Sequence, residues 1–93
     1  MRLRFYIDPG TGEPHIYSHN VQEYEIEEVL DRSIEDRPGG QKSRIAVGQT
    51  EAGRYLRVIY LLDPEPDSRF IVTAYEPGPK ALKALRRRNK RKQ

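Results

Sequence analysis

The sequence predicts one small α+β domain in which an antiparallel sheet is combined with two helices, in the order β-α-β-β-β-α. Two observations lead to this prediction. Clusters of proline and glycine interrupt the chain at residues 8–14, 36–40, 63–68 and 76–79, and such clusters do not continue a regular strand or helix. Between them, apolar residues recur either with the period of two that is typical of strands or with helical spacing. The 93 residues provide enough material for a single core.

The first half of the chain contains one strand and one helix in this prediction. Residues 2–7 alternate apolar side chains with arginine and tyrosine, which indicates a half-buried strand. Residues 21–32 place most of their apolar side chains on one side, and glutamates crowd the first turns, where the positive end of the helix dipole favours acids. We therefore expect a helix there, with Asn20 or Gln22 near its N-cap.

The second half contains three strands and a helix. Residues 44–50 and 54–62 are expected to form a hairpin with a short glycine-containing turn, and the near-continuous apolarity of 54–62 favours a central position. Residues 69–75 supply the next strand of an antiparallel meander. Pro79 then opens a helix with a two-turn apolar stripe. Nothing apolar follows that stripe, so we expect residues 86–93 to be a basic, frayed tail of the same domain.

The two faces of the predicted meander differ in their chemistry. Alternation along residues 54–62 gives one purely apolar face, which we expect the first helix to cover. The opposite face mixes Tyr55, Arg57, Thr73 and Tyr75 with aliphatic side chains. Tyrosine rings stack on bases and arginine pairs with phosphate, so this face suits RNA. The alternative is that Arg57 is a solvated sheet residue and that the tyrosines pack at the rim.

Positive charge is concentrated at the C-terminal end. Residues 80–93 carry eight of the 17 bases and none of the 14 acids, which leaves residues 1–79 with a net charge of −5. Such asymmetry indicates a polyanionic or acidic partner. We expect backbone phosphate to be held there, by counterion release, whether the partner is RNA or DNA. The basic residues assigned to this role are Lys80, Lys83, Arg86, Arg87 and Arg88. An acidic protein partner, or a solvated tail without a partner, remains the alternative.

Several classes of site are excluded or disfavoured. The chain has no cysteine, so disulfides, thiolate metal sites and cysteine nucleophiles are excluded. His15 and His19 are the two histidines, and no acidic ligand has a matching spacing, so we expect no metal and no cofactor. His19 suits an acid/base or structural hydrogen-bonding role, whereas His15 is expected to be a turn residue. The absence of a long apolar run, at the N-terminus or elsewhere, favours a cytoplasmic protein without membrane contact.

Three segments carry a resemblance to known families. The segment SHNV, followed by an acidic helix that ends in VL, resembles the opening of the BrnT-type toxins and the related DUF4258 domains. The run SRIAVGQTEAGRYLRVIY resembles their central hairpin, and FIVTAYEP with the basic helix resembles their final strand and C-terminal helix. The resemblance covers about residues 15–88.

The resemblance implies a RelE-like fold and a metal-independent ribonuclease that cuts mRNA and is blocked by an antitoxin protein. By position, His19 matches the motif histidine, and Arg57 falls in the strand that supplies a basic group. Tyr75 stands where the BrnT pattern has an arginine, and it would act as an acid or as a stacking platform. The alternative functions are a non-catalytic RNA- or DNA-binding module and a partner-binding subunit.

Overall fold

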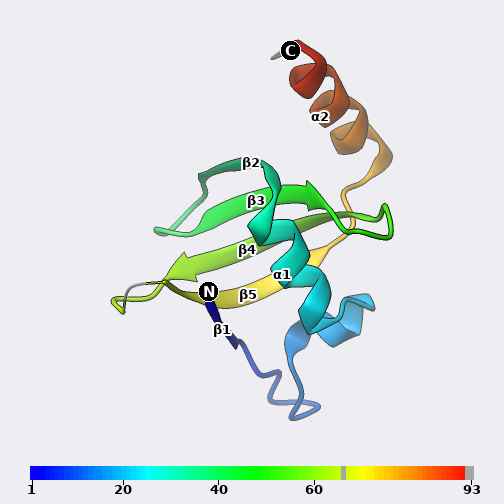
Figure 1. Cartoon of the computed structure of the whole chain (residues 1–93). Helices are drawn as coiled ribbons and strands as arrows, with labels where there is room; N and C mark the ends of the chain where they lie inside the picture. Colours follow the sequence, from blue (N-terminus) through cyan, green and yellow to red (C-terminus); the bar gives the residue numbers. More distant parts are fainter. Residues whose placement is uncertain (66, 92–93) are drawn as a thin grey trace.

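The computed structural model describes residues 1–65 and 67–91, and Figure 1 shows the arrangement of its elements. A mixed sheet is combined with two α-helices and one 3-10 helix, so the α+β class is confirmed. The elements are β1 (Arg2–Phe5), the 3-10 helix η1 (His15–His19), α1 (Glu23–Asp31), β2 (Ser33–Pro38), β3 (Arg44–Gln49), β4 (Tyr55–Leu62), β5 (Ser68–Tyr75) and α2 (Pro79–Arg91).

The sheet has five strands in the order β1-β5-β4-β3-β2. The predicted meander of β3, β4 and β5 is confirmed, with β4 in the centre. The prediction of a wholly antiparallel sheet is wrong at one edge, because β1 pairs in parallel with β5 and places Phe5 beside Ile71. A parallel pair requires a long crossover between its strands, and here the crossover contains the rest of the sheet. The alternation within β1 indicates a strand but does not identify its neighbour.

Strand β2 was not predicted from the sequence. Residues 36–40 were expected to form a loop, but Asp36, Arg37 and Pro38 lie opposite residues of β3 in an antiparallel pair. Proline lacks an N–H and is tolerated at the edge of a sheet, which is the place that β2 occupies. The chain turns only after Pro38, where the Gly39 N–H donates to the Ser43 carbonyl at 2.8 Å.

Helix α1 begins with a capping box. The Gln22 side chain accepts from the first turn of the helix, and the Glu25 carboxylate accepts from the Gln22 N–H at 2.9 Å. Of the two N-cap candidates, Gln22 is therefore the cap. Asn20 instead ends η1 in the left-handed conformation, with a φ of 58°, which asparagine adopts more readily than most residues. The chain thereby turns from η1 back towards Val21, which is fully buried.

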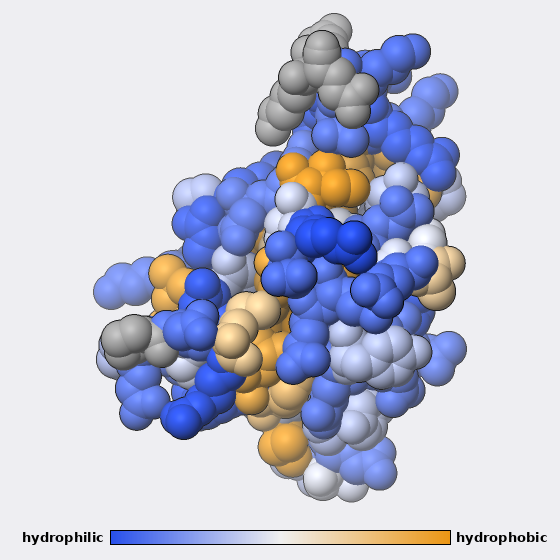
Figure 2. Space-filling view, viewed as in Figure 1, coloured by the Kyte–Doolittle hydropathy of each residue, from blue (hydrophilic) through white to orange (hydrophobic). Residues whose placement is uncertain are grey.

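One face of the sheet forms the core. As predicted, Leu56 and Val58 of β4 are fully buried beneath α1, where Ile26 and Val29 meet them. Gly48 of β3 lets the helix come close, since a Cβ at this position would lie 3.2 Å from a methyl group of Val29. Figure 2 shows this side of the molecule, which is mostly hydrophilic, with hydrophobic atoms in a band down its middle and in a separate patch near α2.

Helix α2 projects from the sheet beyond β2 and β3 (Figure 1). It runs to Arg91, past the apolar stripe, and residues 92–93 of the predicted tail lie outside the described residues. Leu85 is the buried contact of the helix, with 3% exposure. Neither α-helix in the described part of the chain combines the length and the apolarity that crossing a bilayer requires.

Candidate functional site

The rings of His19 and Tyr75 are in contact at the end of β5. Their centroids lie 5.9 Å apart, with the planes tilted by 55°. His19 is the last residue of η1 and is exposed to solvent. Tyr75 is the last residue of β5 and is half-buried. Two of the three residues that were assigned to catalysis therefore meet, although 55 positions of sequence separate them.

Arg57 completes this group from the neighbouring strand. It lies directly opposite Tyr75 in the antiparallel β4–β5 pair, so the two side chains leave the sheet on the same face. This is the face away from α1. The structure thus brings together His19, Arg57 and Tyr75 at one end of the sheet.

The Arg57 guanidinium has hydrogen-bonding capacity that the protein leaves unused. Its Nε is buried and has no hydrogen-bond partner among the described residues, and the same is true of the Thr73 hydroxyl on the adjacent strand. A buried polar group without a partner costs about 1–3 kcal/mol. Such groups are uncommon and often mark places where a ligand supplies the missing bond. An anionic oxygen atom is an acceptor of the kind that the Arg57 Nε–H lacks.

Arg54 anchors η1, a role that the sequence did not indicate. Its guanidinium donates to the Asn20 carbonyl at 2.7 Å, to the Glu25 carboxylate at 3.1 Å and to the Glu76 carboxylate at 2.8 Å. The bonds to Glu76 and then to Glu25 raise the pKa of Arg54 above its usual value. Three segments are thereby joined beside the site: the end of η1, the start of α1 and the residue after Tyr75.

The sequence predicted His15 only as a turn residue, but its ring also contacts His19. Its Nδ1 lies 3.2 Å from a carboxylate oxygen of Asp8. Its ring makes an edge-to-face contact with His19, at 5.4 Å between centroids, and a second contact with Tyr6 at 6.1 Å. The pKa of Asp8 is lowered, first by the hydrogen bond from the Gly10 N–H and then by His15. Four rings therefore form a continuous row that ends at Tyr75.

The described residues contain no group of three or more histidine, cysteine, aspartate or glutamate side chains that is placed to hold a metal ion. The His15–His19 pair accordingly has no third ligand of these kinds in residues 1–65 and 67–91.

The basic helix flanks the same face. A narrow crevice of about 30 Å³ separates α2 from the sheet, and the side chains of Arg37, Arg57 and Arg88 line it. Arg88 is held there by two hydrogen bonds to Glu35 of β2, at 2.7 and 2.9 Å, which raise its pKa. Arg88, one of the cations predicted to bind nucleic acid, is therefore already paired with a carboxylate of the protein.

The remaining assigned cations of α2 are exposed. These are Lys80, Lys83, Arg86 and Arg87. Arg86 reaches back to the sheet, where its guanidinium carbon lies 5.5 Å from the centroid of the Tyr55 ring. Tyr55, the aromatic residue assigned to nucleic-acid binding on the sheet face, thus contacts the helix directly.

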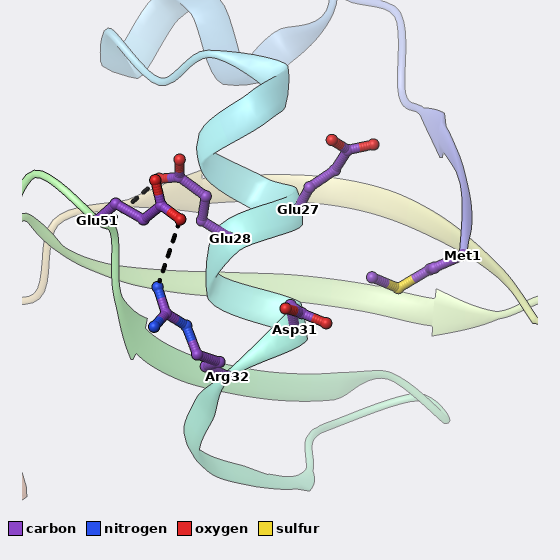
Figure 3. A pocket seen from close by; sticks show the side chains of 6 residues that line it. All are labelled: Met1, Glu27, Glu28, Asp31, Arg32 and Glu51. Atoms are coloured by element: carbon purple, nitrogen blue, oxygen red, sulfur yellow. Dashed lines mark hydrogen bonds and ion pairs between the residues drawn. The ribbon is translucent and has the colours of Figure 1, made fainter.

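The opposite side of the molecule has the opposite charge. An open hollow of about 520 Å³ lies beside α1, and Figure 3 shows its lining, which consists of Met1, Glu27, Glu28, Asp31, Arg32 and Glu51. Four of these six side chains are acids, and Arg32 is already 3.7 Å from the Glu51 carboxylate. A polyanion would be repelled from this hollow, so the charges favour its approach to the face that carries Arg57.

Comparison with known proteins identifies one similarity. Residues 16–76 match a family model described as "Domain of unknown function (DUF4258)". The matched segment includes His19, Arg57 and Tyr75, whereas β1 and α2 lie outside it. No match was found among the curated proteins or among the solved structures.

Proposed function

The chain belongs to the DUF4258 family, and from this premise we propose that it is a metal-independent endoribonuclease that cuts single-stranded mRNA, as the toxin of a toxin–antitoxin pair. The observation that supports the proposal most directly is the place of Tyr75, whose ring contacts His19 and which lies opposite Arg57 in the β4–β5 pair. The resemblance to BrnT-type toxins, which implies a RelE-like ribonuclease and suggested these residues, also supports the proposal.

The reaction requires no group beyond the chain and the RNA. The 2′-hydroxyl attacks the adjacent phosphorus, and the bond from phosphorus to the 5′-oxygen of the next nucleotide breaks, which leaves a 2′,3′-cyclic phosphate. A base takes the proton of the 2′-hydroxyl, and an acid donates a proton to the departing 5′-oxygen. Histidine suits the first role because its unperturbed pKa lies near neutrality. We assign the base to His19 and the acid to the Tyr75 hydroxyl.

Arg57 stabilises the charge that develops on the phosphate. A guanidinium in a partly buried site acts more strongly on a developing oxyanion than it would in water. The Nε of Arg57 has no competing bond among the described residues. In the proposed complex the phosphate would lie beside Tyr75, within reach of His19 and Arg57, its ring contact and its register partner.

The charge distribution gives the RNA a direction of approach. The exposed cations of α2 flank the site, and the acids beside α1 lie on the other side of the sheet. An RNA strand would therefore run from α2 across Tyr55 and Arg57 to η1. An antitoxin that inhibits the enzyme would cover this same face.

Incubation of the purified protein with synthetic single-stranded RNA in EDTA tests the proposal. We expect cleavage that leaves a cyclic phosphate and that disappears when the nucleotide before the cut carries a 2′-deoxyribose. His19→Gln and Arg57→Ala should each lower the rate at least about 100-fold, in the range that acid–base and oxyanion contributions span. Arg32→Ala, on the acidic side, is the matched control and should cut as fast as the wild type. Intact RNA with the folded wild-type protein would refute the proposal.

A non-catalytic nucleic-acid-binding module is the second candidate, and the exposed cations of α2 favour it. It predicts that the same RNA binds, with an affinity that depends on salt, but stays intact. Measuring binding alongside cleavage separates the two functions. Co-purification of an acidic protein without affinity for RNA would instead indicate a partner-binding subunit.

A further inference from the structure

Tyr55 lies on the same face as Arg57, two residues earlier on β4. Alternate residues of a strand are about 6.6 Å apart along its axis, a separation similar to that between consecutive phosphates of an extended single strand. A nucleotide next to the phosphate at Arg57 would therefore lie over Tyr55. The ring is half-buried, so it is held by the sheet and still presents surface to a ligand.

An exposed cation of α2 lies over the Tyr55 ring. The Arg86 guanidinium lies 5.5 Å from the ring centroid, and Arg86 itself is exposed on α2. An exposed cation–π contact is weaker than the stacking of a base on an aromatic ring. A base can thus displace the guanidinium from the ring, and the displaced cation then lies beside the phosphate of the same nucleotide.

Gln49 lies directly opposite Tyr55 in the β3–β4 pair. Its exposed side chain is oriented by one hydrogen bond, from Nε2 to the Gly53 carbonyl at 2.9 Å. An amide also has a second N–H and a carbonyl oxygen, and these groups match the donors and acceptors at the edge of a base. Cross-strand neighbours are about 5 Å apart at Cβ, which is within reach of a base stacked on Tyr55.

We propose that Tyr55, Gln49 and Arg86 form a nucleobase subsite next to the cleavage site. Tyr55 stacks on the base, Gln49 hydrogen-bonds to its edge and determines which base is preferred, and Arg86 moves from the ring to the phosphate. The inference rests on the proposed ribonuclease function, to which it adds a determinant of sequence preference that lies apart from His19 and Tyr75.

Binding of uncleavable RNA tests the subsite without relying on catalysis. The probes are four short 2′-O-methyl oligoribonucleotides of a single base each, labelled with a fluorophore, and anisotropy gives the affinity for the full-length protein. We expect Tyr55→Leu to weaken binding about tenfold or more, as the loss of one stacked base requires, and Tyr55→Phe to retain it. Gln49→Ala should reduce the differences in affinity among the four probes.

Tyr24→Leu is the matched control, because Tyr24 is 61% exposed on α1, away from this face. If Tyr55→Leu binds all four probes as tightly as Tyr24→Leu does, the subsite is refuted. Cleavage assays with ordinary RNA separate this result from the proposed function. If the wild type cuts RNA and Tyr55→Leu cuts it at the same rate and with the same base preference, the subsite alone is overturned. If the wild type binds RNA through Tyr55 but does not cut it, the ribonuclease is overturned and the subsite remains.

Discussion

Arg88 of α2 donates two hydrogen bonds to the Glu35 carboxylate of β2, at 2.7 and 2.9 Å. This bidentate pair and the buried side chain of Leu85 hold α2 against the sheet. Arg37 and Arg57 line the crevice beneath the helix. The Arg88–Glu35 pair and the Leu85 contact, together with that of Arg86 on Tyr55, position the basic helix relative to the site. The pair is exposed at Arg88 and nearly buried at Glu35, with side-chain exposures of 48% and 12%.

Removal of this pair should loosen α2 and leave the sheet intact. We expect faster amide hydrogen exchange across α2 in Arg88→Ala, with unchanged exchange in β4, because local opening depends on local contacts. Lys83→Ala, at an exposed position of the same helix, is the control for the loss of one cation and should exchange as the wild type does. Equal exchange rates in both variants would show that the pair does not hold the helix.

Loss of the Arg54 anchor should affect stability and the site together. Arg54→Met leaves Glu25, which is 7% exposed, without its cation. We expect the free energy of unfolding to fall by roughly 1–3 kcal/mol, which is less than for a fully buried pair because Arg54 retains 22% exposure. Urea denaturation measures the change. Nuclear Overhauser effects between the His19 and Tyr75 rings should weaken in this variant and persist in Arg32→Met.

A side chain at Gly48 should destabilise the protein. In Gly48→Ala the new Cβ would lie 3.2 Å from a Val29 methyl group and 3.3 Å from the Val29 carbonyl oxygen. Helix α1 would have to move away from β3, and overpacking of this kind costs about 1–3 kcal/mol. Gly40→Ala is the matched control, because a Cβ there meets nothing within 4 Å. Thermal unfolding of the two variants compares them, and equal melting temperatures would contradict the close approach of α1.

The Asp63 carboxylate should make stability depend on pH in the acid range. Hydrogen bonds from Arg4, the first cause, and from Ser68 lower its pKa from 3.8 to about 2. Because the pKa is lower in the folded state, the ionised carboxylate makes its full contribution to the free energy of unfolding at pH values above 3.8, the pKa in the unfolded chain. Stability is then lost as the pH falls from about 4 towards 2, as the folded carboxylate takes up a proton.

Urea unfolding at a series of acid pH values measures this loss. Asp63→Asn cannot take up the proton and should show a shallower decline of stability over the same interval. Asp31→Asn, on the exposed side of α1, should decline as the wild type does. A decline in Asp63→Asn as steep as in the wild type would assign the acid sensitivity to other carboxylates.

Arg87 should contribute to RNA affinity through charge alone. It is exposed on α2, and each phosphate contact to a single strand contributes about 0.7 to the slope of log K against log salt. We expect Arg87→Ala to reduce that slope by about this amount, with equal weakening for every RNA sequence. Titrations of a 2′-O-methyl RNA at several salt concentrations give the slope. A slope equal to that of the wild type would show that Arg87 contacts no phosphate. Arg32→Ala, which removes a cation from the acidic side, is the control and should leave the slope unchanged.

Local patterns in the sequence were sufficient for the meander and its faces. The alternation along residues 54–62 depends only on the period of a strand, so Leu56 and Val58 were assigned to the core and Arg57 to the other face. The glutamates in the first turn of α1 and the helix that Pro79 opens were also readable, because capping and dipole effects act between neighbouring residues. The concentration of positive charge in residues 80–93 is a property of composition.

Long-range contacts were decided by the tertiary structure. The parallel pairing of β1 with β5, the edge strand β2 and the hydrogen bonds of Arg54 each join segments whose own sequences do not specify a partner. The resemblance indicated His19, and Tyr75 stands where its pattern has an arginine, but only the turn at Asn20 and the anchor of η1 bring the two rings to 5.9 Å. Local propensity determines which residues form an element, whereas the burial of a shared core determines which elements become neighbours.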